Sequence, residues 1–170
     1  LLCGTLLLAS AAITHAQDWP NRPLRILVGS SPGGGTDAMA RAVADKLGPA
    51  LKTTVVVENK PGASNTLAAD ATAKATDGHT LAIAFNGPLA FAPFLYRKMP
   101  YDPAKDLAPV VMTTSQPNVL AVNAEKVPAK TVAEFVAWAK AQGGKVNYSS
   151  LGNGSSAHLA IERSPAEAGL

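Results

Sequence analysis

The feature that most constrains the fold is a short apolar run followed directly by a glycine-rich loop and a helix-forming segment. Leu24 to Val28 is almost wholly branched and apolar, and a proline and a glycine bound it, which is typical of a strand buried on both faces. Ser30 to Gly35 is predicted to form the loop. Thr36 can cap the next helix, whose expected buried stripe is Met39, Val43 and Leu47.

The same construction continues along the chain. Thr54 to Glu58 is predicted as the next strand, Ser64 to Ala75 as an alanine-rich helix, and Leu81 to Phe85 as a third strand. Asn86 to Pro88 then forms a loop at the carboxyl end of that strand. This alternation of strands and helices predicts an α/β fold with a parallel sheet and right-handed crossovers.

A proline- and aspartate-rich segment without periodicity, Met99 to Asp106, is the expected connection to a second unit. Beyond it, short apolar runs predict further strands at Val110 to Thr113, Val119 to Val122 and Val146 to Ser149. Thr131 and Glu134 form a capping box that opens a helix through Ala141, with an expected inward face of Val132, Val136 and Ala139.

A second glycine-rich loop follows the last of these strands. Leu151 to Ser156 is rich in glycine and serine, and a helix is expected to begin near Ala157, which repeats the first strand–loop–helix unit. Pro165 is expected to break that helix, because an interior proline costs about 3 kcal/mol. The chain is therefore expected to divide into a first lobe at 17–100, a hinge at 101–107 and a partial second lobe at 108–170.

The N-terminal residues 1–16 carry no charge, are too short to span a bilayer and end in small residues, which predicts a cleaved signal peptide and export. The absence of an initiator methionine and of a basic n-region indicates a start downstream of the true N-terminus. Cys3, the single cysteine, lies in this segment, so the mature chain is expected to have no thiol. Lipidation of Cys3 is a weaker interpretation, because the apolar run follows the cysteine.

Composition and motifs argue against several functions. The net charge of +3 is spread without basic runs and aromatic residues reach only 5%, so nucleic-acid binding is not expected. The GGGTD segment lacks the lysine of a Walker loop and the staggered glycines of a dinucleotide loop. His79 and His158 are expected as edge or packing residues, and no cluster has metal-ligand spacing, so no cofactor is expected.

Each glycine-rich loop places small residues just before a helix, where free backbone N–H groups and the helix dipole favour an anion. Either loop alone is as consistent with packing as with binding, and the presence of two favours a carboxylate held between them. Asp37, in the first helical turn, is stabilised by the dipole without any function. It is also a candidate for orienting water or for binding a hydroxyl or ammonium group of a ligand.

Five segments, in order and spacing, resemble the Bug (TctC-like) family of periplasmic substrate-binding receptors of tripartite tricarboxylate transporters: WPNRPLRILV, PGGGTDAMAR, VVVENKPGAS, LYRKMPYDPAKDLAPV and NYSSLGNGSSAHLA. The likeness covers Trp19 to about Ala160. It implies a periplasmic-binding-protein-like architecture, type II-like, with two α/β lobes that close on a small carboxylate without catalysis. The implied ligands are a dicarboxylate, an amino acid or an aromatic acid.

The resemblance also implies a site, partners and a location. The expected partners are the carboxylate ligand and the membrane subunits of a secondary transporter, and the receptor is expected to be a periplasmic monomer. Two departures from the family pattern, Gly29-Ser30 in place of Pro-Phe and GASN at 62–65 in place of GAGG, are expected to reshape the pocket wall. The candidate ligand-binding residues are Ser31, Gly33, Gly34, Gly35, Thr36, Asp37, Asn86, Gly87, Ser149, Gly152, Asn153, Gly154, Ser155 and Ser156.

The resemblance requires roughly another domain's length after Leu170, so the expected architecture is truncated within the second lobe, and the first lobe lacks its C-terminal return strands. Two alternatives stay open. One is an exported α/β hydrolase-like enzyme that uses Ser155 or Ser156, and the other is a nonfunctional fragment of the receptor. The GNGSS segment is not a nucleophile elbow, which favours the receptor over the enzyme.

Overall fold

The computed structural model describes residues 19–150 and 152–168, so the predicted signal peptide lies outside the described residues. Three parallel strands form one sheet: β1 (Leu24–Val28), β2 (Val55–Asn59) and β3 (Thr80–Ile83), in the order β2-β1-β3. Ile26 on the central strand pairs with Val57 on one side and Leu81 on the other. The parallel sheet predicted from the alternation of strands and helices is confirmed.

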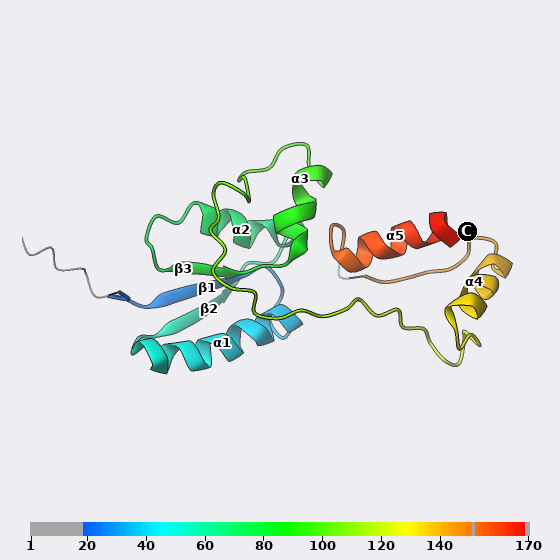
Figure 1. Ribbon diagram of the computed structural model, residues 1–170, viewed down its shortest axis with the longest axis horizontal. Helices are drawn as coiled ribbons and strands as arrows, with labels where there is room; N and C mark the ends of the chain where they lie inside the picture. The colour runs from blue at the N-terminus through cyan, green and yellow to red at the C-terminus, as the bar shows by residue number, and fades with distance from the viewer. Residues whose placement is uncertain (1–18, 151, 169–170) are drawn as a thin grey trace, which may run out of the picture.

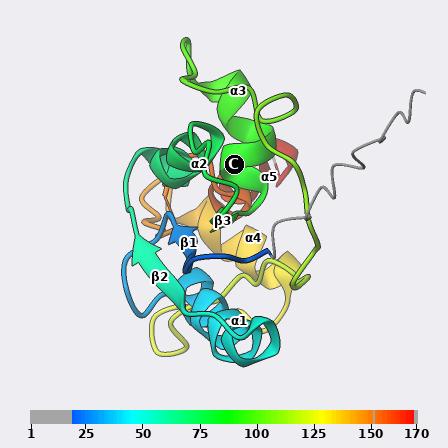
Figure 2. The same cartoon turned by 90° about the vertical axis from the view of Figure 1, so that its left-hand side faces the viewer.

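Helices cover both faces of this sheet, as Figures 1 and 2 show. The long helix α1 (Gly35–Leu51) packs on one face and the shorter α2 (Thr66–Ala73) on the other. The central strand is therefore enclosed on both sides, and Leu24, Ile26 and Val28 are at most 1% exposed. Burial of each such side chain contributes about 1.5–3 kcal/mol, so the apolar run that the sequence presents becomes the core of the sheet.

The predicted second helix begins later than expected. Residues 63–65 form a short 3-10 turn, η1 (Ala63–Asn65), in which all three residues have positive φ, and the regular helix α2 starts only at Thr66. Non-glycine residues rarely adopt the left-handed region, so helix propensity alone could not have predicted this turn.

After β3 the chain forms a single π-helical turn, η2 (Gly87–Phe91), which runs into α3 (Ala92–Leu95). The predicted Asn86–Pro88 loop is thus the start of a helical segment at the carboxyl end of β3. Tyr101 returns to this segment, and its buried hydroxyl donates to the Pro88 carbonyl at 2.7 Å. Burial raises the pKa of Tyr101 to about 12, so the phenol stays a donor at any physiological pH.

The segment at 107–150 does not add strands to the sheet. The strands predicted at Val110–Thr113, Val119–Val122 and Val146–Ser149 are wrong, because these segments run as extended chain without a ladder partner. Val110 and Val119 are each 81% exposed. A strand needs neighbours that satisfy its backbone groups, and none of the described residues supplies them.

Local helix signals in this part hold better than the strand signals. Helix α4 (Val132–Ala141) begins at the predicted capping box: Thr131 Oγ1 accepts from the Glu134 N–H at 3.2 Å, and Glu134 Oε2 accepts from the Lys130 N–H at 2.7 Å. The predicted inward face is only partly right, since Ala139 is buried whereas Val132 is 73% exposed. A cap acts within one turn and therefore needs no packing partner.

The last helix, α5 (Ser156–Ala168), starts where the second glycine-rich loop predicts a helix. The break predicted at Pro165 is wrong, because the helix continues to Ala168. The fixed φ of proline is compatible with helix, so the helix can continue through Pro165 at the cost of one backbone hydrogen bond and a crowded carbonyl in the preceding turn.

Candidate functional site

The candidate site lies at the carboxyl edge of the parallel sheet, where the loops after β1 and β2 meet. The Lys60 N–H donates to the Val28 carbonyl at 2.7 Å, which brings the start of the second loop to the end of β1. A Cβ added at Gly29 would lie 2.4 Å from Asn65 Cβ, so the far end of that loop also rests on β1. In open α/β sheets, ligands bind at this edge.

The first glycine-rich loop forms a tight turn before α1. Gly33 has φ +83, and the Gly34 N–H donates to the Ser31 carbonyl at 3.3 Å. The predicted cap by Thr36 is wrong, because Gly34 is the N-cap residue and no side chain caps the helix. The first backbone N–H groups of α1, at Gly35 and Thr36, therefore have no side-chain cap, and nothing lies within 4 Å of a Cβ built at Gly35.

Asp37 is the most constrained polar residue of this loop. Its side chain is 3% exposed, and its carboxylate accepts hydrogen bonds from the Gly33 N–H at 2.8 Å, from Arg41 Nε at 3.0 Å and from Asn59 Nδ2 at 2.9 Å. Hydrogen bonding to Arg41, then to the Gly33 N–H and to Asn59, holds the pKa of Asp37 well below its usual range. The carboxylate is thus ionised, fully partnered and engaged in shaping the loop.

Arg41 and Asn59 are site-building residues that sequence reasoning missed. Asn59 ends β2, and its amide nitrogen reaches both the Ser30 carbonyl and the Asp37 carboxylate at 2.9 Å, so it ties β2 to the glycine-rich loop. The i, i+4 spacing of Asp37 and Arg41 was a usable signal, because residues so spaced are neighbours on a helix. No local pattern marks Asn59, since its contacts depend on strand pairing.

The second glycine-rich loop has a different internal construction. Ser155 is 4% exposed; its hydroxyl donates to the Gly152 carbonyl at 2.8 Å and accepts from the His158 N–H at 3.1 Å. Ser155 therefore caps α5, as serine commonly does before a helix. Ser156 Oγ donates to Asn118 Oδ1 at 3.2 Å, which ties the extended segment near residue 118 to this loop.

This second loop packs against the first part of the chain. The Ser64 hydroxyl contacts both the Asn153 carbonyl and, at 3.0 Å, the Tyr96 hydroxyl. A Cβ added at Gly87 would lie 3.0 Å from the Gly154 carbonyl oxygen. The structure therefore brings Gly87 and Gly154 together and places Asn153 against Ser64; Ser64 and Tyr96 are contacts that the sequence did not predict.

Several of the remaining predicted site residues are exposed to solvent. Asn86 and Ser149 are exposed, and Ser31 and Gly33 lie on the exposed side of the first loop. No hydrogen bond among the described residues joins the Gly33–Asp37 loop directly to the Gly152–Ser156 loop. Residues 63–65 instead connect the end of β1 to the second loop, because Asn65 touches Gly29 and Ser64 touches Asn153.

The contacts of the serines and histidines bear on the hydrolase alternative. Within the described residues, Ser155 and Ser156 make no hydrogen bond to a histidine ring, and the His158 ring instead contacts Ser150 Oγ at 3.1 Å. His79 lies at the opposite edge of the sheet, where its ring contacts the Asp77 carbonyl. A nucleophile needs its base within hydrogen-bond reach, and neither Ser155 nor Ser156, the two serines of this alternative, has a histidine ring as a hydrogen-bond partner.

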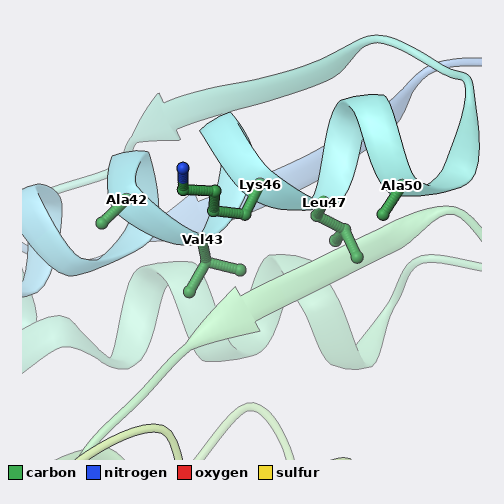
Figure 3. A pocket seen from close by; sticks show the side chains of 5 residues that line it. All are labelled: Ala42, Val43, Lys46, Leu47 and Ala50. Carbon is green, nitrogen blue, oxygen red and sulfur yellow. The ribbon is translucent and has the colours of Figure 1, made fainter.

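Two open hollows lie elsewhere on the molecule. The first, of about 470 Å³, runs along the flank of α1 and is almost wholly apolar, with the Lys46 amine pointing away from the apolar side chains in Figure 3; it is lined by Ala42, Val43, Lys46, Leu47 and Ala50. The second, of about 570 Å³, lies between η2 and α5 and is lined by Phe91, Leu159, Ala160, Arg163 and Ser164. The first has too few donors for an anion and lies away from the carboxyl edge of the sheet.

Two further findings concern the described residues only. None of their helices combines the length and the apolar character that a membrane crossing requires. They also contain no group of three or more histidine, cysteine, aspartate or glutamate residues placed to hold a metal ion.

Solved structures share this fold. A Rhodopseudomonas palustris protein solved with adipate superimposes with a TM-score of 0.84 at 34% identity, over 90% of this chain and 51% of that one. MatC from the same organism, solved with bound malate, gives a TM-score of 0.74 at 28% identity, over 89% of this chain and 52% of that one. The parallel α/β sheet and these likenesses show that the chain has the fold of periplasmic binding proteins.

The family follows from the sequence comparisons. The family described as tripartite tricarboxylate transporter family receptor, TctC, matches residues 39–170. BugT of Bordetella pertussis is 40% identical over 154 residues, which cover 89% of this chain and 47% of BugT. The chain belongs to this receptor family, and it spans about half the length of the curated relatives it matches.

Proposed function

We propose that the chain belongs to an extracytoplasmic solute-binding receptor that captures a small carboxylate for a tripartite tricarboxylate transporter. The observation that carries the proposal is the meeting of glycine-rich and polar loops at the carboxyl edge of the sheet, with residues 63–65 between Gly29, at the end of β1, and the second glycine-rich loop. The relatives solved with adipate and malate support a carboxylate as the ligand class.

The chemistry of the first loop fits an anion. No side chain caps the N-terminus of α1, so the first backbone N–H groups of the helix, at Gly35 and Thr36, have neither an intrahelical nor a side-chain partner. Such donors and the helix dipole favour a carboxylate by electrostatics alone. The charge of Asp37 does not oppose this, because Arg41 and two further donors already engage its carboxylate.

The organisation proposed for the receptor follows the sequence. Residues 17–100 belong to the first lobe, 101–107 to the hinge and 108–170 to the second lobe, and the ligand is held between the lobes. Residues 1–16 act as a cleaved signal peptide that delivers the receptor to the periplasm. The receptor works as a monomer, binds without catalysis and passes its ligand to the membrane subunits of the transporter.

The proposed ligand contacts combine the sequence-predicted residues with the bridge found in the structure. The first lobe contributes Ser31 and the α1 N-terminus, and Asp37 acts by shaping the loop. The second lobe contributes Ser149 and the Gly152–Ser156 loop, and Asn86 and Gly87 line the gap between the two. Ser64 and Tyr96 belong to this set because they contact each other and Ser64 reaches Asn153.

Ligand-dependent thermal unfolding tests this function. The protein expressed from its complete open reading frame is heated with malate, adipate, glutamate and benzoate, and with the diamide of adipate as an uncharged control. A ligand at a hundred times its Kd stabilises the native state by about 2.7 kcal/mol, so at least one acid raises the unfolding temperature and the diamide does not. Equal curves with and without every acid would reject the proposal.

A further inference from the structure

The contact between Gly29 and Asn65 fixes where one side chain points. A Cβ at Gly29 would lie 2.4 Å from Asn65 Cβ and 2.8 Å from Asn65 Cγ, so the carboxamide occupies the space that a side chain at position 29 would fill. Gly29 directly follows β1 at the carboxyl edge of the sheet. The amide is therefore held at the mouth of the candidate site, between the first loop and the segment that reaches the second loop.

The backbone around Asn65 is set for this placement. Asn65 has φ +68, and Ser64 before it has φ +56, so both occupy the left-handed region. Asparagine tolerates this region better than most residues, and strained backbone is maintained where the surroundings demand it. Ser64 is anchored by Tyr96 and Asn153, which fixes the turn from the other side.

The Asn65 amide has no hydrogen-bond partner in the described part of the chain. Its side chain is half-buried, and no hydrogen bond from its oxygen or nitrogen reaches any described residue. The neighbouring asparagine of the site, Asn59, contrasts with it, because the Asn59 amide reaches Ser30, Asp37 and Arg41. A held, partly desolvated amide without a partner is a group available to a ligand.

We infer that Asn65 is a specificity-determining residue whose carboxamide hydrogen-bonds a hydroxyl group of a hydroxycarboxylate. This inference rests on the proposed function and names the substrate class of that same site. An amide offers both a donor and an acceptor, which a hydroxyl group can match in both senses.

A second carboxylate is a poorer match for this position. The cations of the loops that adjoin this position form ion pairs: Lys60 Nζ lies 2.8 Å from Glu58, and Arg41 Nε lies 3.0 Å from Asp37. The position therefore offers a neutral polar group rather than a free positive charge, and a hydroxyl is the substituent that loses least on leaving water for it.

The test compares pairs of acids that differ by one hydroxyl group. The affinities of malate and succinate, lactate and propionate, and mandelate and phenylacetate are measured by calorimetry with the protein from its complete open reading frame. One net hydrogen bond makes the hydroxy acid of the best-bound pair about fivefold to tenfold tighter. No preference for the hydroxy acid in any bound pair would overturn the inference while leaving the receptor function intact.

Two variants place the preference on Asn65. Asn65→Gly keeps the left-handed backbone without strain, and we expect equal affinity for the two acids with the affinity for the plain acid unchanged. Asn65→Asp keeps the shape but adds a negative charge, and we expect weaker binding of both acids. Thermal unfolding of each variant verifies that it is folded.

Asn123→Ala is the matched control, because Asn123 is exposed and its side chain accepts from the Glu125 N–H within its own turn. It should keep the full preference. A preference retained in Asn65→Gly, or affinities unchanged in Asn65→Asp, would show that the amide does not face the ligand. If the unaltered protein binds none of the carboxylates, the proposed function itself is rejected.

Discussion

Two regions of this chain have similar apolar sequence patterns but form different structures. Around β1, four apolar residues of a five-residue strand become the buried centre of a parallel sheet, and Val28 is 0% exposed. Between residues 107 and 150, apolar runs of similar length stay extended and open, and Val119 is 81% exposed. Both patterns predict strands, yet only the first has neighbours on both sides. Apolar patterning specifies a tendency, and pairing partners decide whether it is used.

The two glycine-rich loops form a second instructive pair. The first is held by a carboxylate, since Asp37 accepts hydrogen bonds from the Gly33 N–H, Arg41 and Asn59. The second is closed by a neutral serine cap, Ser155. Loops that look alike in sequence therefore differ in electrostatics, and only the first should respond strongly to acid.

The same substitution in the two regions should give the largest contrast. Val28→Ala removes two buried methyl groups and leaves a cavity, and we expect a loss of about 2–3 kcal/mol in the free energy of unfolding. Val119→Ala, at an exposed position, should change it by less than about 0.5 kcal/mol. Urea unfolding of both variants measures the difference. Equal losses would mean that the second region is packed as tightly as the first.

A pair of glycines tests the contact between the loops at the sheet edge. Gly29→Ala places a Cβ 2.4 Å from Asn65 Cβ and 2.7 Å from its Cα, and we expect a loss of about 1–3 kcal/mol. Gly35→Ala meets nothing within 4 Å and begins a helix, so it should be neutral or slightly stabilising. Thermal unfolding compares them. A stable Gly29→Ala variant would argue against the close approach of the two loops.

Acid unfolding should separate the two glycine-rich loops. The folded pKa of Asp37 lies below its unfolded value, so its contribution to stability is full above the unfolded pKa of about 3.9 and is lost as pH falls toward the folded pKa. We therefore expect Asp37→Asn to be less stable than the unaltered chain near neutral pH and to lose stability less steeply with acid. Parallel pH profiles for the two proteins would show that the carboxylate does not have this role.

The cap of α4 should give the smallest of these effects. Thr131→Ala removes the hydroxyl that accepts from the Glu134 N–H, and we expect a loss of about 1 kcal/mol of helix stability. Thr113→Ala, in the extended and exposed segment, is the control and should change nothing measurable. Hydrogen exchange of the α4 amides measures the difference. Unchanged protection in Thr131→Ala would indicate that tertiary contacts, not the cap, hold α4.

Much of the first half could be predicted from the sequence, because its signals are local and agree with one another. The run at 24–28, the glycine-rich loop and the following helix all appear where the pattern places them. The Thr131 cap is equally local and is present although little packs around α4. Contacts within one turn or one loop depend on neighbouring residues only, so the sequence by itself determines them.

Only the tertiary structure decided the rest, because it depends on which distant segments meet. Parallel pairing brings Asn59 to Asp37 and Asn65 onto Gly29, and no spacing in the sequence marks either contact. The strands predicted beyond residue 107 do not form, since a ladder requires a second strand that the described residues do not offer. Local chemistry thus set the elements and the two glycine-rich loops, and long-range pairing chose the polar groups that stand between those loops.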